Sequence, residues 1–330
     1  MTPNPHDPRT GTTARPAGWV TFVVKAAAFL AIALVFTETL WHSLGYLPAK
    51  SDLMQFAKLR QAADGNPRAV ALVGSSRVRY GLNPLALERA VPGWRVLQLG
   101  ILGNSAMPVL EDLAQDPNFR GLAVCEFNPA HWGGGSPFPH PPEALAYMHP
   151  KVSGAYLETV LSEHFRERFS FYSYNLFTEL PRIAQHKFIP QPERPDRFEL
   201  SLDLGPTVNQ HLIQGWESAA LEASESVKRT GSARIVRDVQ GWVDRIRRRG
   251  GGVAFVRMPV DGRLRVFEDS VFPQTQSLIR EVRALGVVVI DFAEMPEHFR
   301  CPDGSHLEAS EADRFSRLVG QELAAGGLFR

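Results

Sequence analysis

Five short apolar runs, separated by longer helical patterns, constrain the fold of this sequence more than any other feature. The runs are Ala69–Val73, Arg95–Leu99, Leu122–Phe127, Val253–Val256 and Val287–Ile290. Each has the length of a strand, is rich in Val, Leu or Ile, and does not alternate between apolar and polar residues. Strands that are buried on both faces of a parallel sheet have this composition. The runs therefore predict a mainly parallel, five-stranded sheet.

Amphipathic helices are predicted beside these strands. Ile235–Arg249 places its apolar residues on one stripe and ends in arginines that are followed by three glycines. Cations complement the dipole at a helix C-terminus and glycine permits the left-handed cap, so we interpret the arginines as a helix end rather than a nucleic-acid patch. Glu308–Ala325 is predicted as a final helix, and Ser51–Asp64 as a short one before the first strand. The predicted fold class is α/β.

A different pattern appears near the N-terminus, where Trp19–Phe36 carries one charge, Lys25, and no helix breaker. At about 1.5 Å per residue this stretch is roughly 27 Å long, close to the thickness of one bilayer core. Trp41 stands where an interfacial aromatic residue is expected, and Arg9 and Arg15 precede the stretch. The positive-inside rule places the residues before the stretch in the cytoplasm and the rest of the chain outside.

Two alternatives to an uncleaved anchor are a cleaved signal peptide and a buried core helix. A signal peptide requires a small-residue cleavage site after its apolar run, and here Thr-Glu-Thr-Leu-Trp-His follows instead. A core helix requires a polar face, and this stretch has almost none. The prediction is therefore a disordered cytoplasmic tail at 1–18, a transmembrane anchor at 19–41, a juxtamembrane linker and helix at 42–67, and an α/β domain at 68–330. An insertion at about 132–230, rich in proline and aromatic residues, is interpreted as a lid or cap.

Composition excludes several classes of function. The chain has 36 Lys and Arg against 35 Asp and Glu, a net charge of +1 that calls for no nucleic-acid partner. Two cysteines, Cys125 and Cys301, cannot build a disulfide framework or a four-cysteine zinc site. We favour two separate buried thiols over a bridge between them, although an oxidising compartment would permit pairing. The histidines lack the spacing of metal ligands, and no metal or other cofactor is expected.

Candidate site residues follow the first three predicted strands, at the edge where open parallel sheets place their sites. The first strand is followed by Gly74-Ser75-Ser76-Arg77, the second by Gly100 and Gly103, and the third by Asn128. A serine in such a turn can present its hydroxyl to a substrate and its backbone N–H to an oxyanion. Plain turn chemistry accounts for the same residue types.

A further candidate lies between the fifth strand and the last helix, in Cys301-Pro302-Asp303-Gly304-Ser305-His306-Leu307. A carboxylate three residues before a histidine can accept the imidazole Nδ1–H, fix the tautomer and leave Nε2 to act as a general base toward a serine. The alternative is an ordinary turn that contains an incidental histidine.

In their order along the chain, these segments resemble the SGNH (GDSL-like) hydrolase superfamily. That family has a nucleophilic serine after the first strand, an oxyanion glycine after the second, an oxyanion asparagine after the third, and an Asp-x-x-His pair before the last helix. The corresponding residues here are Ser76, Gly103, Asn128, Asp303 and His306. The family pattern favours Ser76 over Ser75 as nucleophile, with its N–H as a further oxyanion donor. The third block departs from the usual Gly-x-Asn-Asp and reads Glu-Phe-Asn-Pro. The resemblance implies a three-layer α/β/α sandwich, flavodoxin-like in its layers.

One N-terminal anchor combined with these blocks resembles the membrane-anchored extracytoplasmic branch of the superfamily, which includes the alginate O-acetylation and teichoic-acid D-alanylation proteins. The resemblance implies a single-pass protein of the bacterial inner membrane with a periplasmic catalytic domain. It also implies a glycopolymer substrate and a partner, either a membrane-bound O-acyltransferase (MBOAT) or a polysaccharide synthase complex.

The leading hypothesis from the sequence is an acyltransferase or esterase that acts on a cell-surface polysaccharide through an acyl-enzyme on Ser76. Arg77, Arg79 and Trp132 are weaker candidates for substrate binding, the arginines for a uronate or phosphate and the tryptophan for stacking on a sugar. Two alternatives remain: a stand-alone esterase that needs no partner, and a non-catalytic subunit that docks onto a membrane acyltransferase or synthase.

Overall fold

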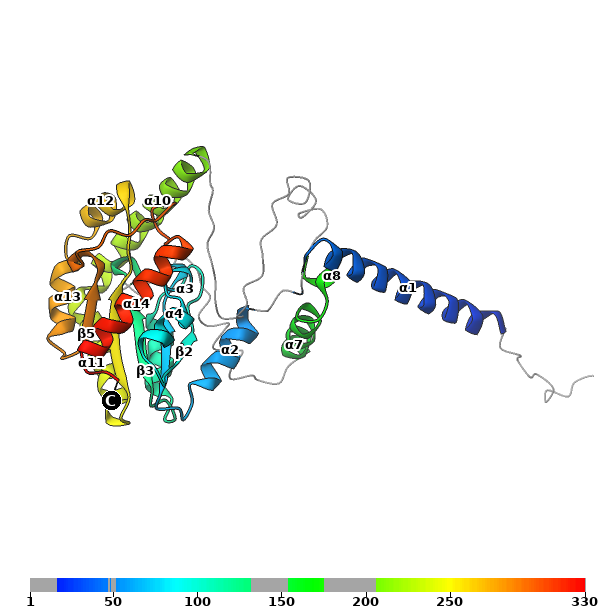
Figure 1. Ribbon diagram of the computed structural model, residues 1–330, viewed down its shortest axis with the longest axis horizontal. Helices are drawn as coiled ribbons and strands as arrows, with labels where there is room; N and C mark the ends of the chain where they lie inside the picture. Colours follow the sequence, from blue (N-terminus) through cyan, green and yellow to red (C-terminus); the bar gives the residue numbers. More distant parts are fainter. Residues whose placement is uncertain (1–16, 47, 49–51, 132–153, 175–205, 330) are drawn as a thin grey trace, which may run out of the picture. The chain divides into compact units, whose positions relative to one another are not determined.

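The computed structural model of the chain describes residues 17–46, 48, 52–131, 154–174 and 206–329 (Figure 1). The predicted tail therefore lies almost wholly outside the described residues, as does the first part of the predicted insertion. The described residues group into two compact units. The first unit draws on 1–49 and 160–191, and the second on 50–159 and 192–330. We describe each unit by itself.

The second unit contains a five-stranded sheet in which all strands are parallel, in the order β2-β1-β3-β4-β5. The strands are β1 (Ala69–Val73), β2 (Arg95–Gln98), β3 (Leu122–Glu126), β4 (Gly252–Arg257) and β5 (Val288–Asp291). Each of the five apolar runs forms one of these strands, within one residue at each end. The prediction of an α/β fold with a parallel five-stranded sheet is confirmed.

One helix of this unit precedes the first strand, and the others connect the strands or follow the last of them. They are α2 (Asp52–Ala62), α3 (Ser76–Gly81), α4 (Pro84–Ala90), α5 (Met107–Gln115), α10 (Pro206–Thr230), α11 (Ser232–Arg248), α12 (Gly262–Val271), α13 (Thr275–Arg283) and α14 (Ala309–Ala325). The short 3-10 turns η1 (Pro129–His131) and η2 (Phe292–Glu294) follow β3 and β5.

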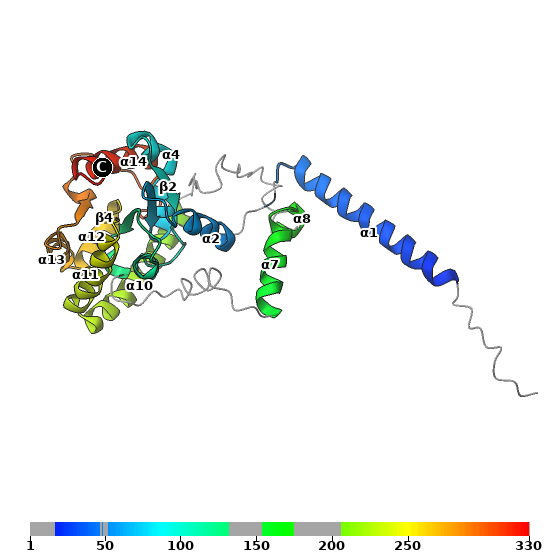
Figure 2. The same cartoon turned by 90° about the horizontal axis from the view of Figure 1, so that it is seen from below.

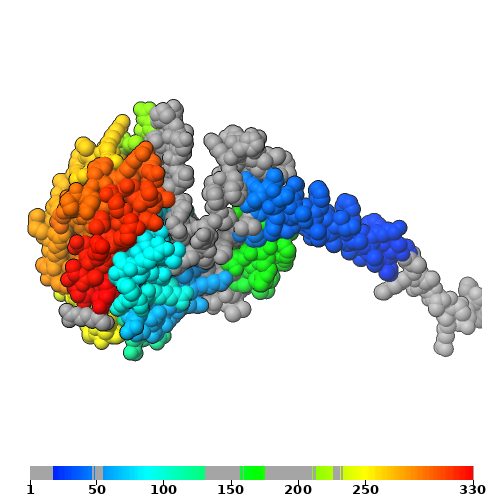
Figure 3. Space-filling view, viewed as in Figure 1, coloured from blue at the N-terminus to red at the C-terminus, as the bar shows by residue number. Residues whose placement is uncertain are grey.

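Each face of the sheet has its own hydrophobic cluster, because successive strand side chains point to opposite faces. Ala71 and Val73 belong to the cluster that includes apolar residues of α5, α11 and α13. Val70 and Leu72 belong to the cluster that includes those of α3, α4 and α14. Figure 2 shows α11 on one side of the sheet and α14 with α4 on the other, and Figure 3 shows the red surface of α14 against the cyan segment that contains α3 and α4. The two clusters hold the sheet between its helices. Because all five strands are parallel, their carboxyl ends lie at one edge of the sheet.

The first unit is built on α1 (Ala17–Ser43). Residues 18–43 form a helix that is long and apolar enough to span a membrane, and no residue of its most apolar window is buried. Part of α7 (Gly154–Arg166) and all of α8 (Ser170–Ser173) belong to the same unit. A portion of the predicted insertion thus groups with the N-terminal helix rather than with the sheet.

Candidate active site

Ser76 begins α3 directly after the turn that ends β1. Ser75 is the N-cap of this helix, and its Oγ accepts a hydrogen bond from the backbone N–H of Arg77 at 3.2 Å. The backbone N–H of Ser75 donates to Glu126 Oε2 at 2.6 Å. A Cβ added to Gly74 would lie 2.7 Å from that same oxygen and 2.5 Å from Val78 Cγ2, so the turn requires glycine there. The hydroxyl of Ser75 is engaged as a cap, and the hydroxyl of Ser76 is directed elsewhere.

Ser76, His306 and Asp303 form a continuous hydrogen-bonded relay. Ser76 Oγ lies 2.8 Å from His306 Nε2, and His306 Nδ1 lies 2.6 Å from Asp303 Oδ2. The carboxylate accepts the Nδ1–H, which leaves Nε2 unprotonated and able to accept the proton of the serine hydroxyl. The structure therefore brings together the three residues that the sequence analysis predicted to be catalytic. Ser76 and His306 are 230 positions apart in the chain.

The loop that carries Asp303 and His306 is stabilised by hydrogen bonds from its backbone N–H groups to the carboxylate of Asp303. Asp303 Oδ1 accepts the N–H groups of Ser305 at 2.9 Å and of His306 at 2.7 Å. Gly304 adopts a φ of 80°, a left-handed conformation that favours glycine. Burial raises the pKa of Asp303, but the hydrogen bonds and charge interaction with His306 and the two N–H donors outweigh burial and hold that pKa below its usual value. Asp303 is therefore ionised at neutral pH.

Two aromatic rings flank the imidazole of His306. The ring centroids of Tyr80 and Trp216 each lie 5.6 Å from that of His306, and both rings meet it edge to face. Tyr80 belongs to α3 and Trp216 to α10. Such contacts limit the rotation of the imidazole and shield it from water. The predicted insertion thus contributes one wall of the site through α10.

Arg77 makes an internal ion pair. Its guanidinium donates to both carboxylate oxygens of Glu268, on α12, and its Nε donates to Ser305 Oγ at 3.0 Å. Burial lowers the pKa of Arg77, but the charge of Glu268, its hydrogen bonds to the guanidinium and the charge of Glu126 together outweigh burial and hold that pKa above its usual value. Arg77 follows Ser76, and Ser305 lies between Asp303 and His306. The guanidinium therefore links the serine turn to the histidine loop.

Replacement of Arg77 by Met is expected to destabilise the fold by about 3–5 kcal/mol, because it leaves the carboxylate of Glu268 buried without its cation. The double variant Arg77→Met/Glu268→Met is the matched control, since it removes both charges and should recover much of the loss. Urea unfolding of the three proteins measures the difference. Equal stability of the single and double variants would contradict this account of the pair.

Two further residues were predicted to bind substrate, Arg79 and Trp132. Arg79 is on α3 and is buried, with its backbone N–H bonded to the carbonyl of Ser75. Trp132 lies outside the described residues.

The loops that carry the predicted oxyanion donors are hydrogen-bonded to the turn at Gly74–Ser76, either directly or through Glu126. The loop after β2 is tied to Gly74, whose carbonyl accepts the N–H of Ile101 at 2.9 Å, and Gly103 follows two residues later with a φ of 68°. Asn128 follows β3 and is buried; its Nδ2 donates to Glu126 Oε1 at 3.2 Å and its Oδ1 accepts the N–H of Ala130 at 3.0 Å. An amide has two N–H groups, so one bond to Glu126 leaves a second donor.

Besides Tyr80, three residues of this site had no role in the sequence analysis. Glu126 joins the serine turn to Asn128, Glu268 neutralises Arg77, and Trp216 packs on His306. Only Glu126 had a local signal, because it is the one charged residue in an otherwise apolar strand, LAVCE. The other two reach the site through tertiary packing.

The cysteines do not compete with Ser76 as nucleophiles. Cys125 and Cys301 are both buried and both free, which agrees with the interpretation as separate thiols. Burial raises the pKa of Cys301 to about 12 and that of Cys125 still further, and a thiol attacks only as the thiolate. Across the described ranges, no group of three or more His, Cys, Asp or Glu residues is arranged to hold a metal ion.

Comparison with known proteins gives no family assignment. No protein-family model matches the chain, and no curated protein matches it in sequence. The argument about function therefore depends on the geometry of the site.

Proposed function

We propose that the chain is a membrane-anchored acyltransferase or esterase of the SGNH type, built as a three-layer α/β/α sandwich. It transfers or removes acetyl-like acyl groups on a cell-surface polysaccharide. The observation that carries the proposal is the relay from Asp303 through His306 to Ser76, with contacts of 2.6 and 2.8 Å. An ionised carboxylate, an imidazole and a serine hydroxyl in this order form the machinery of nucleophilic acyl transfer.

Acylation begins when Ser76 Oγ attacks the carbonyl carbon of an acyl ester. The hydroxyl proton moves to His306 Nε2 as the new C–O bond forms, and the carbonyl electron pair moves to the oxygen. Backbone N–H groups at Ser76 and Gly103, together with the amide of Asn128, donate to that oxyanion. As the tetrahedral intermediate collapses, the bond to the leaving group breaks and His306 returns its proton to the departing oxygen. The charge of Asp303 stabilises the imidazolium in between.

Deacylation repeats these steps with a different nucleophile. A sugar hydroxyl or a water molecule gives its proton to His306 Nε2 and attacks the acyl-enzyme, and Ser76 leaves with that proton. A sugar hydroxyl gives transfer, and water gives hydrolysis. The choice of a polysaccharide acceptor follows from the resemblance to the extracytoplasmic O-acylation proteins, as does an MBOAT-type or synthase partner.

The proposed location of the protein in the cell is supported by α1. A helix of this length and hydropathy suits a single-pass anchor, and the arginines before it favour a cytoplasmic N-terminus in the inner membrane. The second unit then lies in the periplasm, where exported glycopolymers are acylated.

Labelling with a fluorophosphonate tests the proposal, because such probes react only with an activated serine. The full-length protein in detergent should incorporate one phosphonyl group per chain, on the peptide that contains Ser76. Ser75→Ala should label normally and Ser76→Ala should not label. Absence of labelling in the unsubstituted protein would overturn the catalytic assignment and favour the non-catalytic subunit.

A further inference from the structure

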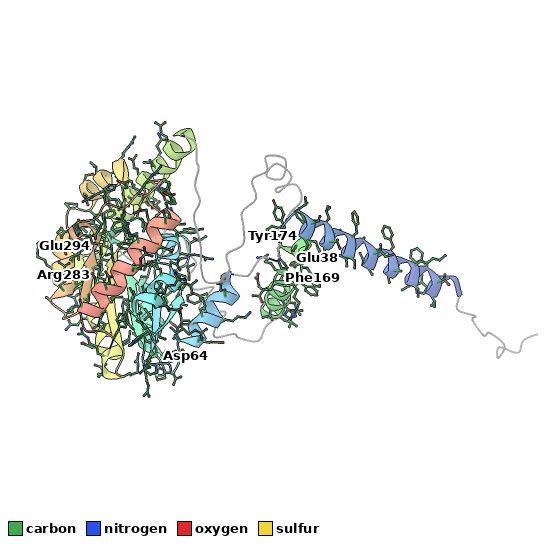
Figure 4. The ribbon with its side chains drawn as sticks, viewed as in Figure 1. Glu38, Asp64, Phe169, Tyr174, Arg283 and Glu294 are labelled. Atoms are coloured by element: carbon green, nitrogen blue, oxygen red, sulfur yellow. The ribbon has the colours of Figure 1, made fainter. Side chains whose placement is uncertain are left out.

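The chain returns to α1 about 130 residues after leaving it. The carboxylate of Glu38, near the C-terminal end of α1, accepts the backbone N–H groups of Ser170 at 3.0 Å and Phe171 at 3.1 Å. The hydroxyl of Ser170 donates to the carbonyl of Tyr46 at 3.0 Å. Figure 4 shows Glu38, Phe169 and Tyr174 gathered where α8 meets this end of α1. These bonds tie α8 to one fixed position along α1.

That position lies at the boundary of the apolar stretch. The uninterrupted apolar residues of α1 end at Phe36, and Glu38 follows about 3 Å further along the axis at 1.5 Å per residue. A carboxylate is costly within hydrocarbon and is accommodated at the interface. If α1 spans a bilayer, Glu38 lies at headgroup depth, and the groups bonded to Glu38 must lie at the same depth.

Aromatic side chains gather at this depth. The ring centroid of Trp41 is 5.0 Å from that of Tyr46 and 5.8 Å from that of Tyr174, and the two tyrosine rings are 4.9 Å apart. Trp and Tyr are enriched at both membrane–water interfaces because one end of the ring system is apolar and the other is polar. The cluster therefore has the composition of an interfacial belt, although one of its members is distant in sequence from α1.

The segment next to this cluster exposes a row of large apolar side chains. Leu161 is 48% exposed, Phe165 47% and Tyr172 45%. A spacing of four residues places the α7 members on one side of the helix. The row is held in place, since Phe165 stacks on Phe169 at 6.0 Å and the Tyr172 hydroxyl is 2.7 Å from Ser162 Oγ. His164 and Arg168, close to Phe165 in sequence, are both exposed, and their side chains contact each other.

We infer that α8 and the part of α7 from residue 160 onward lie on the outer surface of the membrane that α1 spans, with the row Leu161, Phe165 and Tyr172 in the lipid interface. The occupant of this face is the phospholipid surface itself, because α8 is bonded to α1 at headgroup depth and the apolar row continues from that point. Arg168, close to the row in sequence, suits lipid phosphates. The inference depends on α1 spanning the membrane and is independent of the chemistry at Ser76.

A consequence follows for the path of the chain. In the order of the sequence, residues 52–131, which carry Ser76, come after α1 and before α8, the two segments that the inference places at the membrane. The insertion that was predicted to be a lid then contains a second membrane attachment, formed by α8 and the part of α7 from residue 160 onward.

Spin labelling of the full chain in nanodiscs tests the inference. The discs contain phosphatidylcholine and phosphatidylglycerol at three to one and no other protein. Labels are placed at Leu161→Cys and Phe165→Cys, with Arg166→Cys as the matched control, because Arg166 is exposed on the same helix but lies away from the row. The unsubstituted chain checks that the buried native cysteines take no label. A label at Phe29→Cys tests separately whether α1 spans the disc.

Collision with oxygen, which concentrates in lipid, is compared with collision with a water-soluble nickel complex. Labels at 161 and 165 should show an oxygen-to-nickel ratio severalfold higher than the label at 166, together with a high ratio at 29. Equal ratios at 161, 165 and 166 would overturn the inference and assign the face to a protein partner or to another segment of this chain. A low ratio at 29 would also overturn the inference, because the depth of Glu38 depends on α1, and would leave the proposed function of Ser76 intact.

Discussion

Replacement of Ser76 by Ala is expected to lower the turnover of an acyl ester by roughly 10⁴- to 10⁶-fold, since the nucleophile is lost while the fold is kept. The adjacent serine provides the matched control. Ser75→Ala removes the N-cap of α3 and should cost about 1 kcal/mol of stability, yet it leaves the relay from Asp303 to Ser76 in place. Steady-state hydrolysis of an acetyl ester by the two purified variants measures the contrast.

The same pair of variants distinguishes the roles considered for the protein in cells. The ester-linked acyl content of the surface polysaccharide should fall in cells that carry Ser76→Ala and stay near normal with Ser75→Ala. Unchanged content with Ser76→Ala, at normal protein levels, would contradict the catalytic role. Such a result would favour the non-catalytic subunit, for which loss of α1 should matter and loss of the hydroxyl should not.

The strands were predictable because the signal for a buried parallel strand is local. An uninterrupted apolar run of four to six residues marks each of them. The bounds were less predictable where a charged residue belongs to a strand. β4 continues to Arg257, which is buried because its guanidinium donates to Asp269 at 2.9 Å and lies 3.6 Å from Asp291. No window of sequence reveals that pairing.

The residues of the relay were predictable from the order of short blocks. Ser76 follows a strand end, where open parallel sheets place their sites, and Asp303 and His306 lie in the loop before the last helix. The residues that surround the relay of Asp303, His306 and Ser76 were not predictable in this way. The sequence suggested that Arg77 binds an anionic group of the substrate. In the structure its guanidinium instead forms an ion pair with Glu268, which is 191 positions away in the chain. Trp216 reaches His306 from a helix with no distinguishing motif. The bond from Glu38 to α8 uses backbone N–H groups, which every residue except proline has, so it leaves no trace in the sequence.

Asp303→Asn is expected to lower turnover by about 10⁴-fold while leaving Ser76 and His306 in position. An amide in place of the carboxylate can donate to His306 Nδ1, which selects the tautomer that carries its proton on Nε2. That nitrogen then donates to Ser76 Oγ and can no longer accept its proton. Asp261→Asn is the matched control, because Asp261 caps α12 from the same neighbourhood and asparagine caps equally well. Comparable loss in both variants would contradict the tautomer argument.

The stability of Asp303→Asn should also depend less on acid than that of the unsubstituted protein. The fold holds the pKa of Asp303 below its usual 3.8, so ionisation of this group stabilises the folded state above that value, and the contribution is lost as pH falls through the folded pKa. Asparagine has no such contribution at any pH. The advantage of the unsubstituted protein over the variant in urea unfolding should therefore be largest near pH 6 and shrink toward pH 3. A constant difference across this range would show that Asp303 is not preferentially ionised in the folded protein.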